Sequence, residues 1–594
     1  MSIERKATWA ALPSTTRAVS VHLSYDLKSD RLAYASGKSV YLRSVANPAE
    51  TVQFNGHNFN TTVAKFAPSG FYVASGDESG NVKIWDAAGD EQIVKGDYTV
   101  INGRINDLAW DADSQRIIAV GDGKERYGHC FTWDSGNTVG EISGHSAVVN
   151  AVAIRPVRPY RAATVSDDAG LVFLQGPPFK FSMSVRGNHT NFVRDVAFSK
   201  DGNFIVSVGA DRAIVLYDGK SGEFLKKIGE SSSHEGGIFA VSWVLDSTTE
   251  FVTASADASV KLWDAESGEL IRTWSLEKSL SNQVLGVVST KDYIISLTYS
   301  GDLYYWTKDS DSPAKIVSGH QKSITSLVEV GDKLYSSSYD GRVVNWDLES
   351  GSAEVVAGEG HSNLVVGIAK SETGTLTTAA WDDTVKTIAG GKFTSSSSLD
   401  QQPVGIASNG KISVVATEDY LASYEGSTLL KKIKLDFPAT TVDISSSVIA
   451  VGDASGFNVK LYSTDLTPSS SSLPALRSKP SSLKISPDEK YLAAGDVSGK
   501  ITLYDLATYT VKTSRWAFHT ASINSMSWHK DNDHLVSGSL DTGFIVYSVS
   551  KPVKNIKSTN AHKEGTNAVE WLDESTIVTA GSDAALKFWK VTFH

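Results

Sequence analysis

The stretch GGIFAVSWVLDSTTEFVTASADASVKLWD, residues 236–264, decides the fold of this chain. It contains three short runs in which apolar and polar residues alternate, and turn residues separate the runs. Alternation with a period of two indicates half-buried β-strands rather than helices. The same pattern recurs at residues 191–218 and 566–590. A unit that returns roughly every 42 residues is typical of a propeller blade.

A set of polar residues accompanies this pattern. A His precedes the first strand, a Ser or Thr closes the second, an Asp follows four residues later, and a Trp ends the third strand. Three sets are complete: His234, Thr253, Asp257 and Trp263; His320, Ser336, Asp340 and Trp346; and His562, Thr579, Asp583 and Trp589. Four sets are partial: His145, Thr164 and Asp168; His189, Ser207, Asp211 and Tyr217; His361, Thr378 and Asp382; and His519, Ser537, Asp541 and Tyr547. In all of them the His and the Asp lie 20 to 23 residues apart.

These sets have two interpretations. A buried carboxylate needs hydrogen-bond donors, which the His can supply while the hydroxyl orients the His and the indole N–H completes the chain. The other interpretation is a series of catalytic or metal-binding Asp–His pairs, but such a pair has no reason to recur once in every repeat. We therefore expect structural tetrads of the WD-repeat type, which connect the strands of one blade.

The number of repeats predicts two domains. Degenerate repeats keep the strand pattern near residues 25–42, 57–86, 105–134, 284–306, 404–424, 442–462 and 483–505. Single propellers have four to eight blades, and a ring of fourteen would leave a wide unfilled centre. We expect an all-β protein with two seven-bladed WD-repeat β-propellers in tandem, fourteen blades in all, at residues 1–315 and 316–594. In an alternative assignment, residues 1–15 complete the C-terminal propeller, because a closed ring leaves no unpaired strand edge.

Composition narrows the classes of function. The 594 residues carry a net charge of −11 and show no basic stripe of the kind that nucleic-acid binding requires. Cys130 is the only cysteine, so a disulfide framework and a thiolate metal cluster are excluded, and a reducing compartment fits. The sequence lacks a secretory signal and a long apolar run. We expect a cytoplasmic protein without nucleic-acid or membrane partners.

Enzyme signatures do not appear in the sequence. GxxxxGK[ST], HExxH and GxSxG are all missing. Carboxylate pairs do occur, such as Asp167 with Asp168 and Asp382 with Asp383, but they lie in blade turns where the tetrad explains one member of each. The sequence predicts a non-enzymatic protein without a cofactor or metal.

One departure from the repeat marks a candidate binding surface. Residues 171–192 read LVFLQGPPFKFSMSVRGNHTNF, where GPPFKF sets two prolines beside two phenylalanines and a lysine. Prolines restrict the backbone, so flanking side chains are held at low entropic cost, and a rigid aromatic side chain suits an interface. In the alternative interpretation, Phe179 and Phe181 alternate in an outer strand and pack beneath the next blade.

A second departure is GDGKERYGHCFTWDSGNTVG, at residues 121–140. It enlarges the turn before the third strand and adds Lys124, Glu125 and Arg126, which a solvated loop would also explain. Adjacent blades would place Glu125 and Asp167 on one face, where they would form an acidic patch suited to a basic partner.

The sequence also resembles the actin-interacting protein one family, called WD-repeat protein one in animals, and its fungal members in particular. The resemblance runs from the region of His22 to the C-terminal LKFWK. It rests on GKERYGHCFTWDSGN, QGPPFKFSMSVRGNHTNFVRDVAFS, SGEFLKKI, SHEGGIFAVSW, AAWDDTVK and VKTSRWAFHTASINSMSW. It implies two seven-bladed propellers in an open clamshell that cooperates with cofilin to disassemble actin filaments, by severing them and capping their barbed ends. It further implies a monomer at cortical actin structures.

The resemblance also suggests a site on the N-terminal propeller. Matched by motif, actin and cofilin binding would fall on Glu125, Asp167, Lys180, Phe181 and Phe192. One departure is Tyr127, where related chains often carry Phe. The competing interpretation is a general WD-repeat scaffold or adaptor for another complex, because a fold alone does not fix a function.

Overall fold

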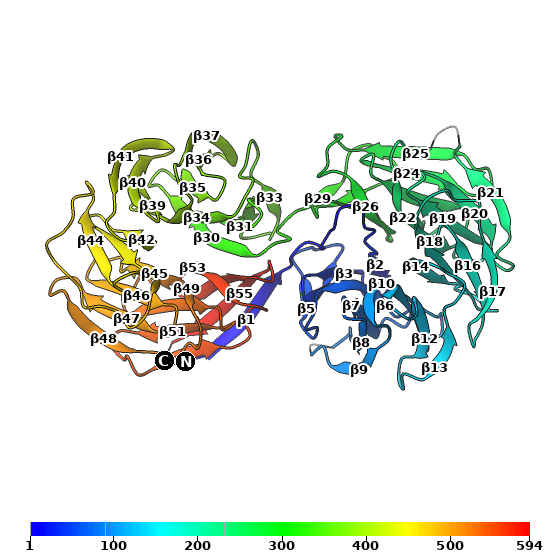
Figure 1. Cartoon of the computed structure of the whole chain (residues 1–594), viewed down its shortest axis with the longest axis horizontal. Coiled ribbons are helices and arrows are strands. Elements are labelled where there is room, and N and C mark those ends of the chain that lie inside the picture. Colours follow the sequence, from blue (N-terminus) through cyan, green and yellow to red (C-terminus); the bar gives the residue numbers. More distant parts are fainter. Residues whose placement is uncertain (1, 90, 231–232, 594) are drawn as a thin grey trace. The chain divides into compact units, whose positions relative to one another are not determined.

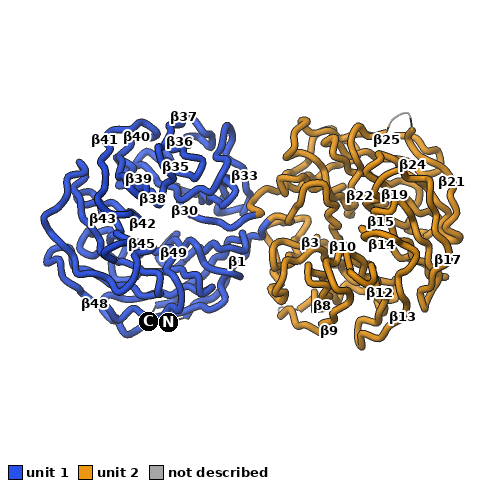
Figure 2. The backbone as a smooth tube through the Cα atoms, in the orientation of Figure 1, with its two compact units in different colours: residues 1–11, 322–594 blue, residues 12–321 orange. Residues whose placement is uncertain are grey.

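The computed structural model describes residues 2–89, 91–230 and 233–593, and their regular elements are all β-strands (Figure 1). Within these residues the strands form fourteen antiparallel sheets, each a propeller blade. The expected pair of seven-bladed WD-repeat propellers is confirmed, because the sheets divide equally between two compact units (Figure 2). In the described chain no helix is long and apolar enough to cross a membrane.

Residues 12–321 form the unit that we call the N-terminal propeller. In each of its seven described sheets, consecutive strands pair with one another. Blade by blade, the strands are β2 (Ser24–Asp26), β3 (Arg31–Ser36), β4 (Ser39–Ser44) and β5 (Thr51–Phe54); β6 (Thr61–Phe66), β7 (Tyr72–Asp77), β8 (Asn81–Asp86) and β9 (Val94–Thr99); β10 (Gly103–Trp110), β11 (Arg116–Gly123), β12 (Gly128–Thr132) and β13 (Thr138–Glu141); β14 (Val149–Ile154), β15 (Arg161–Ser166), β16 (Leu171–Gln175) and β17 (Lys180–Val185); β18 (Val193–Phe198), β19 (Phe204–Gly209), β20 (Ile214–Asp218) and β21 (Phe224–Ile228); β22 (Ile238–Trp243), β23 (Glu250–Ser255), β24 (Ser259–Asp264) and β25 (Leu270–Ser275); and β26 (Val284–Ser289), β27 (Ile294–Thr298), β28 (Leu303–Trp306) and β29 (Lys315–Val317).

Residues 1–11 and 322–594 form the C-terminal propeller. Its strands are β30 (Ile324–Val330), β31 (Lys333–Ser338), β32 (Val343–Asp347) and β33 (Ala353–Val355); β34 (Val365–Lys370), β35 (Leu376–Ala380), β36 (Thr384–Ala389) and β37 (Lys392–Ser398); β38 (Pro403–Ser408), β39 (Ser413–Thr417), β40 (Tyr420–Glu425) and β41 (Thr428–Lys434); β42 (Ala439–Ile444), β43 (Val448–Asp453) and β44 (Val459–Ser463); β45 (Pro480–Ile485), β46 (Tyr491–Asp496), β47 (Ile501–Asp505) and β48 (Thr510–Trp516); β49 (Ile523–Trp528), β50 (His534–Ser539), β51 (Phe544–Ser548) and β52 (Asn555–Ser558); and β53 (Thr566–Trp571), β54 (Thr576–Gly581) and β55 (Leu586–Thr592), with β1 (Ser2–Trp9).

The two ends of the chain share one blade. β1 pairs antiparallel with β55, and Ser2 lies opposite Thr592 (Figure 1). The Trp9 ring lies 4.3 Å from that of Phe588 and 5.5 Å from that of Trp346. At the other boundary, β29 pairs with β28, so residues 315–317 belong with the first seven blades, and the units divide after Gln321.

Apolar side chains on facing surfaces of neighbouring blades pack together. Between the blade of β18–β21 and that of β22–β25, Val206 and Leu216 pack with Phe251 and Trp263. Burying a side chain of this size stabilises a fold by about 1.5–3 kcal/mol. Many blades also carry a bulge near the start of their first strand pair, as at Ile238 in β22, and a bulge increases local twist.

The tetrads connect the strands of individual blades. His234 Nδ1 lies 3.0 Å from Asp257 Oδ2, and its Nε2 lies 2.8 Å from Thr253 Oγ1, which also accepts from Trp263 Nε1 at 2.8 Å. The tetrad of His562, Thr579, Asp583 and Trp589 repeats these bonds at 2.8, 2.7 and 2.8 Å. Burial lowers the pKa of His562, which keeps its imidazole neutral inside the blade.

The set that begins at His320 is divided between the two units. His320 is the next-to-last residue of the N-terminal unit, whereas Ser336, Asp340 and Trp346 lie in the C-terminal one. There, Trp346 Nε1 donates to Ser336 Oγ at 2.7 Å, and Ser338 Oγ donates to Asp340.

One complete tetrad was missed by the sequence sets. His57 Nδ1 lies 2.8 Å from Asp77 Oδ2, its Nε2 lies 2.7 Å from Ser75 Oγ, and Trp85 Nε1 donates to Ser75 at 3.0 Å. The Asp follows its Ser by two residues instead of four, and Ser79 occupies the position where an Asp was expected. Ser79 compensates by donating both its backbone N–H and its hydroxyl to Asp77 Oδ1, at 2.9 and 2.6 Å.

Candidate functional site

Three of the predicted site residues lie at one end of the N-terminal blades. Glu125 lies between β11 and β12, Asp167 between β15 and β16, and Phe192 between β17 and β18. Antiparallel strands return the chain to the same end of a sheet at every second connection, so these three connections share a face. It is the face on which the tetrad His and Asp residues enter each blade.

Lys180 and Phe181 belong to the blade that contains Asp167, but they lie at another part of it. They begin the outer strand β17, and Lys180 pairs with Gln175 at the end of β16 that is remote from Asp167. The backbone of this pair therefore lies on the rim of the propeller, while the Phe181 ring lies against Gly144, the residue before the tetrad His145.

The motif GPPFKF places its two phenylalanines in different environments. Phe179 is buried, and its backbone N–H donates to Val139 O at 2.9 Å. Its ring packs with Cys130 and Ile142, so it fills the contact with the preceding blade and not with the next one. Phe181 is 48% exposed. Of the two aromatic side chains, Phe181 is the one available to a partner.

Asp167 and Phe192 come from neighbouring blades and are connected through an arginine. Asp167 Oδ1 accepts from Asn150 Nδ2 at 2.8 Å and lies 3.6 Å from Arg194 NH1. The Arg194 guanidinium lies 5.0 Å from the centre of the Phe192 ring, within the range of a cation–π contact. Burial lowers the pKa of Arg194, and Asp167 opposes that shift. Arg194 and Asn150 were not among the predicted site residues, because both occupy regular strand positions and do not interrupt the repeat.

Glu125 extends the same face on the adjacent blade. It is exposed between Lys124 and Arg126, and Arg126 NH1 lies 3.8 Å from Glu141 Oε1 on β13. Tyr127, the departure from the family pattern, is half-buried against the core of this blade. Among the described contacts, Asp167 is connected with Phe192, but neither is connected with Glu125.

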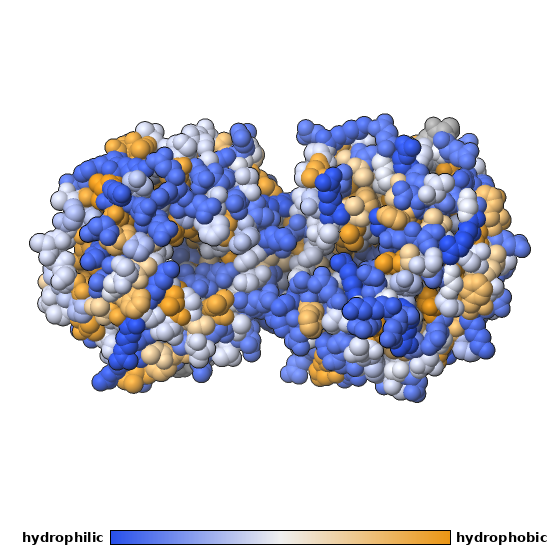
Figure 3. Space-filling view, viewed as in Figure 1, coloured by the Kyte–Doolittle hydropathy of each residue, from blue (hydrophilic) through white to orange (hydrophobic). Residues whose placement is uncertain are grey.

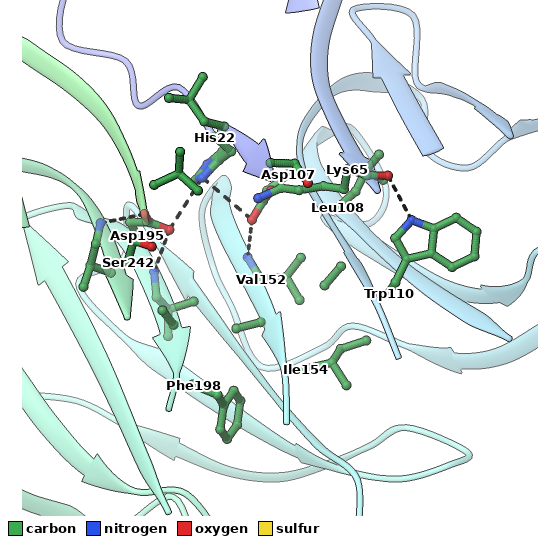
Figure 4. A pocket seen from close by; sticks show the side chains of 18 of the residues that line it. His22, Lys65, Asp107, Leu108, Trp110, Val152, Ile154, Asp195, Phe198 and Ser242 are labelled. Carbon is green, nitrogen blue, oxygen red and sulfur yellow. Dashed lines mark hydrogen bonds and ion pairs between the residues drawn. The ribbon is translucent and has the colours of Figure 1, made fainter. Parts of the chain in front are cut away.

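A second polar cluster lies at the centre of the N-terminal propeller. The first strands of its seven described blades surround a cavity of about 380 Å³. There, His22 Nδ1 lies 3.5 Å from Asp195 Oδ1 and 3.9 Å from Asp107 Oδ2, and Lys65 Nζ lies 3.3 Å from Asp107 Oδ1 (Figure 4). Burial raises the pKa of Asp195.

The buried carboxylates of this cavity have a structural explanation. Asp107 Oδ2 accepts from the Val152 backbone N–H at 3.1 Å, and Asp195 Oδ2 accepts from that of Val241 at 2.9 Å (Figure 4). Each carboxylate thereby connects its blade to the next one, as a buried acceptor must find donors. The C-terminal propeller repeats this bond, where Asp443 Oδ2 accepts from the Ile485 N–H at 2.7 Å.

The chain matches known proteins over its whole length. The family model for the WD domain, G-beta repeat, matches residues 49–86, 180–218, 225–264, 311–347 and 511–548. An uncharacterized WD repeat-containing protein of Schizosaccharomyces pombe is 42% identical over all of both chains. WD repeat-containing protein 1 of Xenopus tropicalis is 37% identical over all of both chains. Actin-interacting protein 1 of Drosophila melanogaster is 35% identical over 99% of this chain and 98% of its own.

Proposed function

Because the chain belongs to the family of WD repeat-containing protein 1 and actin-interacting protein 1, we propose that it binds actin filaments and cooperates with cofilin to disassemble them, by severing filaments and capping their barbed ends. The observation that carries this proposal is 35% sequence identity, over 99% of this chain, to a relative named for its interaction with actin. The protein acts by binding, without covalent chemistry, as a monomer in the cytoplasm at cortical actin structures.

The binding surface proposed for actin and cofilin, the candidate patch, consists of Glu125, Asp167, Lys180, Phe181 and Phe192. Its two phenylalanines are 48% and 42% exposed, and large aromatic side chains of this kind commonly anchor protein interfaces. Its acidic members suit a basic partner surface and would guide association. The backbone of Lys180 and Phe181 lies on the rim and the other members lie on the loop face, so a single partner would contact both.

The proposed activity has a simple thermodynamic basis. A ligand that binds cofilin-decorated filaments more tightly than bare ones shifts the population toward the decorated state. Two propellers on one chain can also engage two sites, and the second contact then gains from a high effective concentration.

Sedimentation of filaments tests the proposal. The full-length protein is mixed with actin filaments, with and without cofilin, and the actin left in the pellet is measured. We expect the protein to reduce the pellet only when cofilin is present. An unchanged pellet in the presence of cofilin would contradict the proposal and favour a scaffold for another complex. A scaffold would also leave the number of filament ends unchanged, which a seeded-elongation assay measures.

A further inference from the structure

The turn between β49 and β50 in the C-terminal propeller has an unusual composition. Residues 529–534 read HKDNDH, with a histidine at each end and an aspartate near the middle. The His529 backbone N–H donates to His534 O at 2.8 Å, so the two histidines face each other across the hairpin. Directly opposed residues project to the same side of a sheet. The hairpin therefore holds both imidazoles on one side of its turn.

Three potential ligand atoms converge there. His529 Nδ1 lies 2.9 Å from Asp531 Oδ2, and His534 Nδ1 lies 2.6 Å from the same oxygen. All three atoms lie within 4.8 Å of one another.

Other contacts hold this arrangement in place. Asp531 Oδ1 accepts from the backbone N–H groups of Asp533 and His534 at 2.8 and 2.9 Å, which aims Oδ2 at the imidazoles. On its far side, His534 Nε2 lies 3.8 Å from Asp533 Oδ2, which itself accepts from the Ser548 hydroxyl at 2.7 Å. At 3.8 Å this carboxylate does not accept a hydrogen bond, but its charge favours a proton on Nε2, which leaves Nδ1 as the ligand atom; metal sites commonly use a carboxylate behind the imidazole in this way.

The contact between His529 and Asp531 favours a cation. The Asp531 backbone N–H donates to His529 Nδ1 at 3.3 Å, so this nitrogen carries a lone pair, and ligation would exchange that long hydrogen bond for the ion. A lone pair that lies 2.9 Å from a carboxylate oxygen is repelled unless a positive charge lies between them. A cation between the imidazole nitrogen and the carboxylate oxygen would remove that repulsion.

The same turn in other blades shows that the fold does not need these histidines. Residues 486–491 form a turn of the same length in the preceding blade, with Ser486, Asp488 and Tyr491 at the matching positions. Ser486 Oγ donates to Asp488 Oδ1 at 2.7 Å, and the fourth residue has a positive φ in both turns, 57° at Glu489 and 59° at Asn532. Ser and Tyr thus satisfy the turn, and the two histidines are additions to it.

Aromatic rings cover the inner side of the cluster and leave its outer side open. The His529 ring lies 4.8 Å from that of Trp571, and the His534 ring lies 4.3 Å from that of Phe593. His529 is buried, whereas Asp531 is exposed. An ion bound here would be coordinated by three protein ligands and would keep at least one coordination position for water.

We propose that His529, Asp531 and His534 bind one divalent transition-metal ion of the zinc class. Two imidazole nitrogens and one carboxylate oxygen form a donor set that zinc, copper and nickel accept, whereas calcium and magnesium prefer oxygen ligands alone. Ligand atoms at a tetrahedral ion are about 3.3 Å apart for bonds of ~2.0–2.2 Å. The present separations of 2.9 and 2.6 Å need only a slight opening of the turn.

Titration calorimetry of the full-length, chelator-treated protein with Zn²⁺ tests the proposal. The decisive variant is His529→Ser combined with His534→Tyr, which gives the turn the residues of 486–491 and should fold. We expect one equivalent bound by the parent protein and none by the double variant. Lys530→Ala, in the same turn but without a ligand atom, is the matched control and should bind as the parent does.

A second measurement keeps the test independent of folding. Cu²⁺ bound to the parent protein should give an electron paramagnetic resonance spectrum with splitting from two imidazole nitrogens. Asp533→Asn should weaken binding by about 10-fold or more, because it removes the supporting carboxylate. The proposal is overturned if the parent binds no Zn²⁺ at about 100 µM, corresponding to less than roughly 5.5 kcal/mol of affinity, or if the double variant keeps the bound equivalent.

Discussion

The two propellers present different side chains at one equivalent position, the residue immediately before the tetrad Asp. In the N-terminal propeller this residue is Asp167, Ala210 or Ala256. In the C-terminal propeller it is Ser582 or one of three large, exposed residues, Tyr339, Trp381 and Leu540. The space-filling view shows hydrophilic residues interspersed with smaller hydrophobic groups on the visible face of each unit (Figure 3).

The backbone at this position is the same in both propellers. The N–H of Asp167 donates to Val148 O at 3.0 Å, and the N–H of Leu540 donates to Ser522 O at 3.0 Å. The fold thus fixes the main chain through a hydrogen bond to the preceding segment, and the side chain takes no part in that bond. The comparison shows that the tetrad framework is common to the two propellers, whereas their surfaces can diverge without cost to it.

The largest effect is expected where the common framework itself is broken. Asp583→Ala removes the partner of His562 and of Lys587, whose Nζ lies 3.6 Å from Asp583 Oδ2 and is buried. Leaving a buried charge unpaired should lower the free energy of unfolding by about 3–5 kcal/mol. Asp257→Ala removes the acceptor of His234 and Ser259, but the nearby Lys261 is only half-buried, so about 1–3 kcal/mol is expected. Urea unfolding followed by tryptophan fluorescence measures both, and equal effects would contradict the role given to Lys587.

The central cavity of the C-terminal propeller should make the free energy of unfolding depend on pH. The first strands of the C-terminal propeller line a cavity of about 570 Å³ that contains Glu570, where burial raises the pKa to about 7 against the attraction of Lys484. The folded carboxyl keeps its proton at a pH where the unfolded one, with a pKa of about 4.3, has lost it. The stabilisation is complete below that lower value and is lost as pH rises through about 7, a total of roughly 3–4 kcal/mol.

Glu570→Gln isolates this effect, because it keeps the shape and removes the titration. The free energy of unfolding, obtained from urea titrations between pH 4.5 and pH 8, should fall more steeply with pH for the parent protein than for the variant. The two slopes should differ by roughly 1.4 kcal/mol per pH unit where the difference is greatest. Parallel curves would show that Glu570 is ionised in the folded state throughout.

If filaments bind at the rim as proposed, substitutions of two phenylalanines at equivalent positions of adjacent blades should have different effects on binding. Phe181 lies opposite Leu174 and Phe224 lies opposite Tyr217, so they occupy the same register position in adjacent blades. They are 48% and 46% exposed. Phe181→Ala should weaken binding to cofilin-decorated filaments by about 10–30-fold, as loss of an interface anchor does, while Phe224→Ala leaves it unchanged. Cosedimentation at increasing protein concentration gives both affinities, and equal losses would refute the patch.

The smallest effect is expected at the divergent position itself. Leu540 is 52% exposed, and its contribution to the turn is made by the backbone. Leu540→Asp, which copies the residue at Asp167, should change the free energy of unfolding by less than about 0.5 kcal/mol. A loss above 1 kcal/mol, which urea unfolding would detect, would show that the side chains of the two faces are not interchangeable.

Part of the candidate site could be predicted from the sequence. The departures from the repeat indicated the turn of Glu125 and the GPPFKF motif, because an insertion or a proline pair interrupts a regular pattern. They could not indicate which phenylalanine is exposed, since both fit an outer strand. Arg194 could not be found in this way, because its importance comes from contacts with Asp167 and Phe192, which lie on different blades.

The sequence by itself determined the fold class and the number of blades, because strand alternation, repeat length and tetrad spacing are local properties that recur from blade to blade. The tertiary structure alone decided which residues meet across blades and across the chain. It placed β1 beside β55, buried Phe179 while exposing Phe181, and brought His529, Asp531 and His534 into one cluster. These outcomes depend on packing between segments that are distant in sequence or on the exact path of a turn, and a repeat pattern carries no information about either.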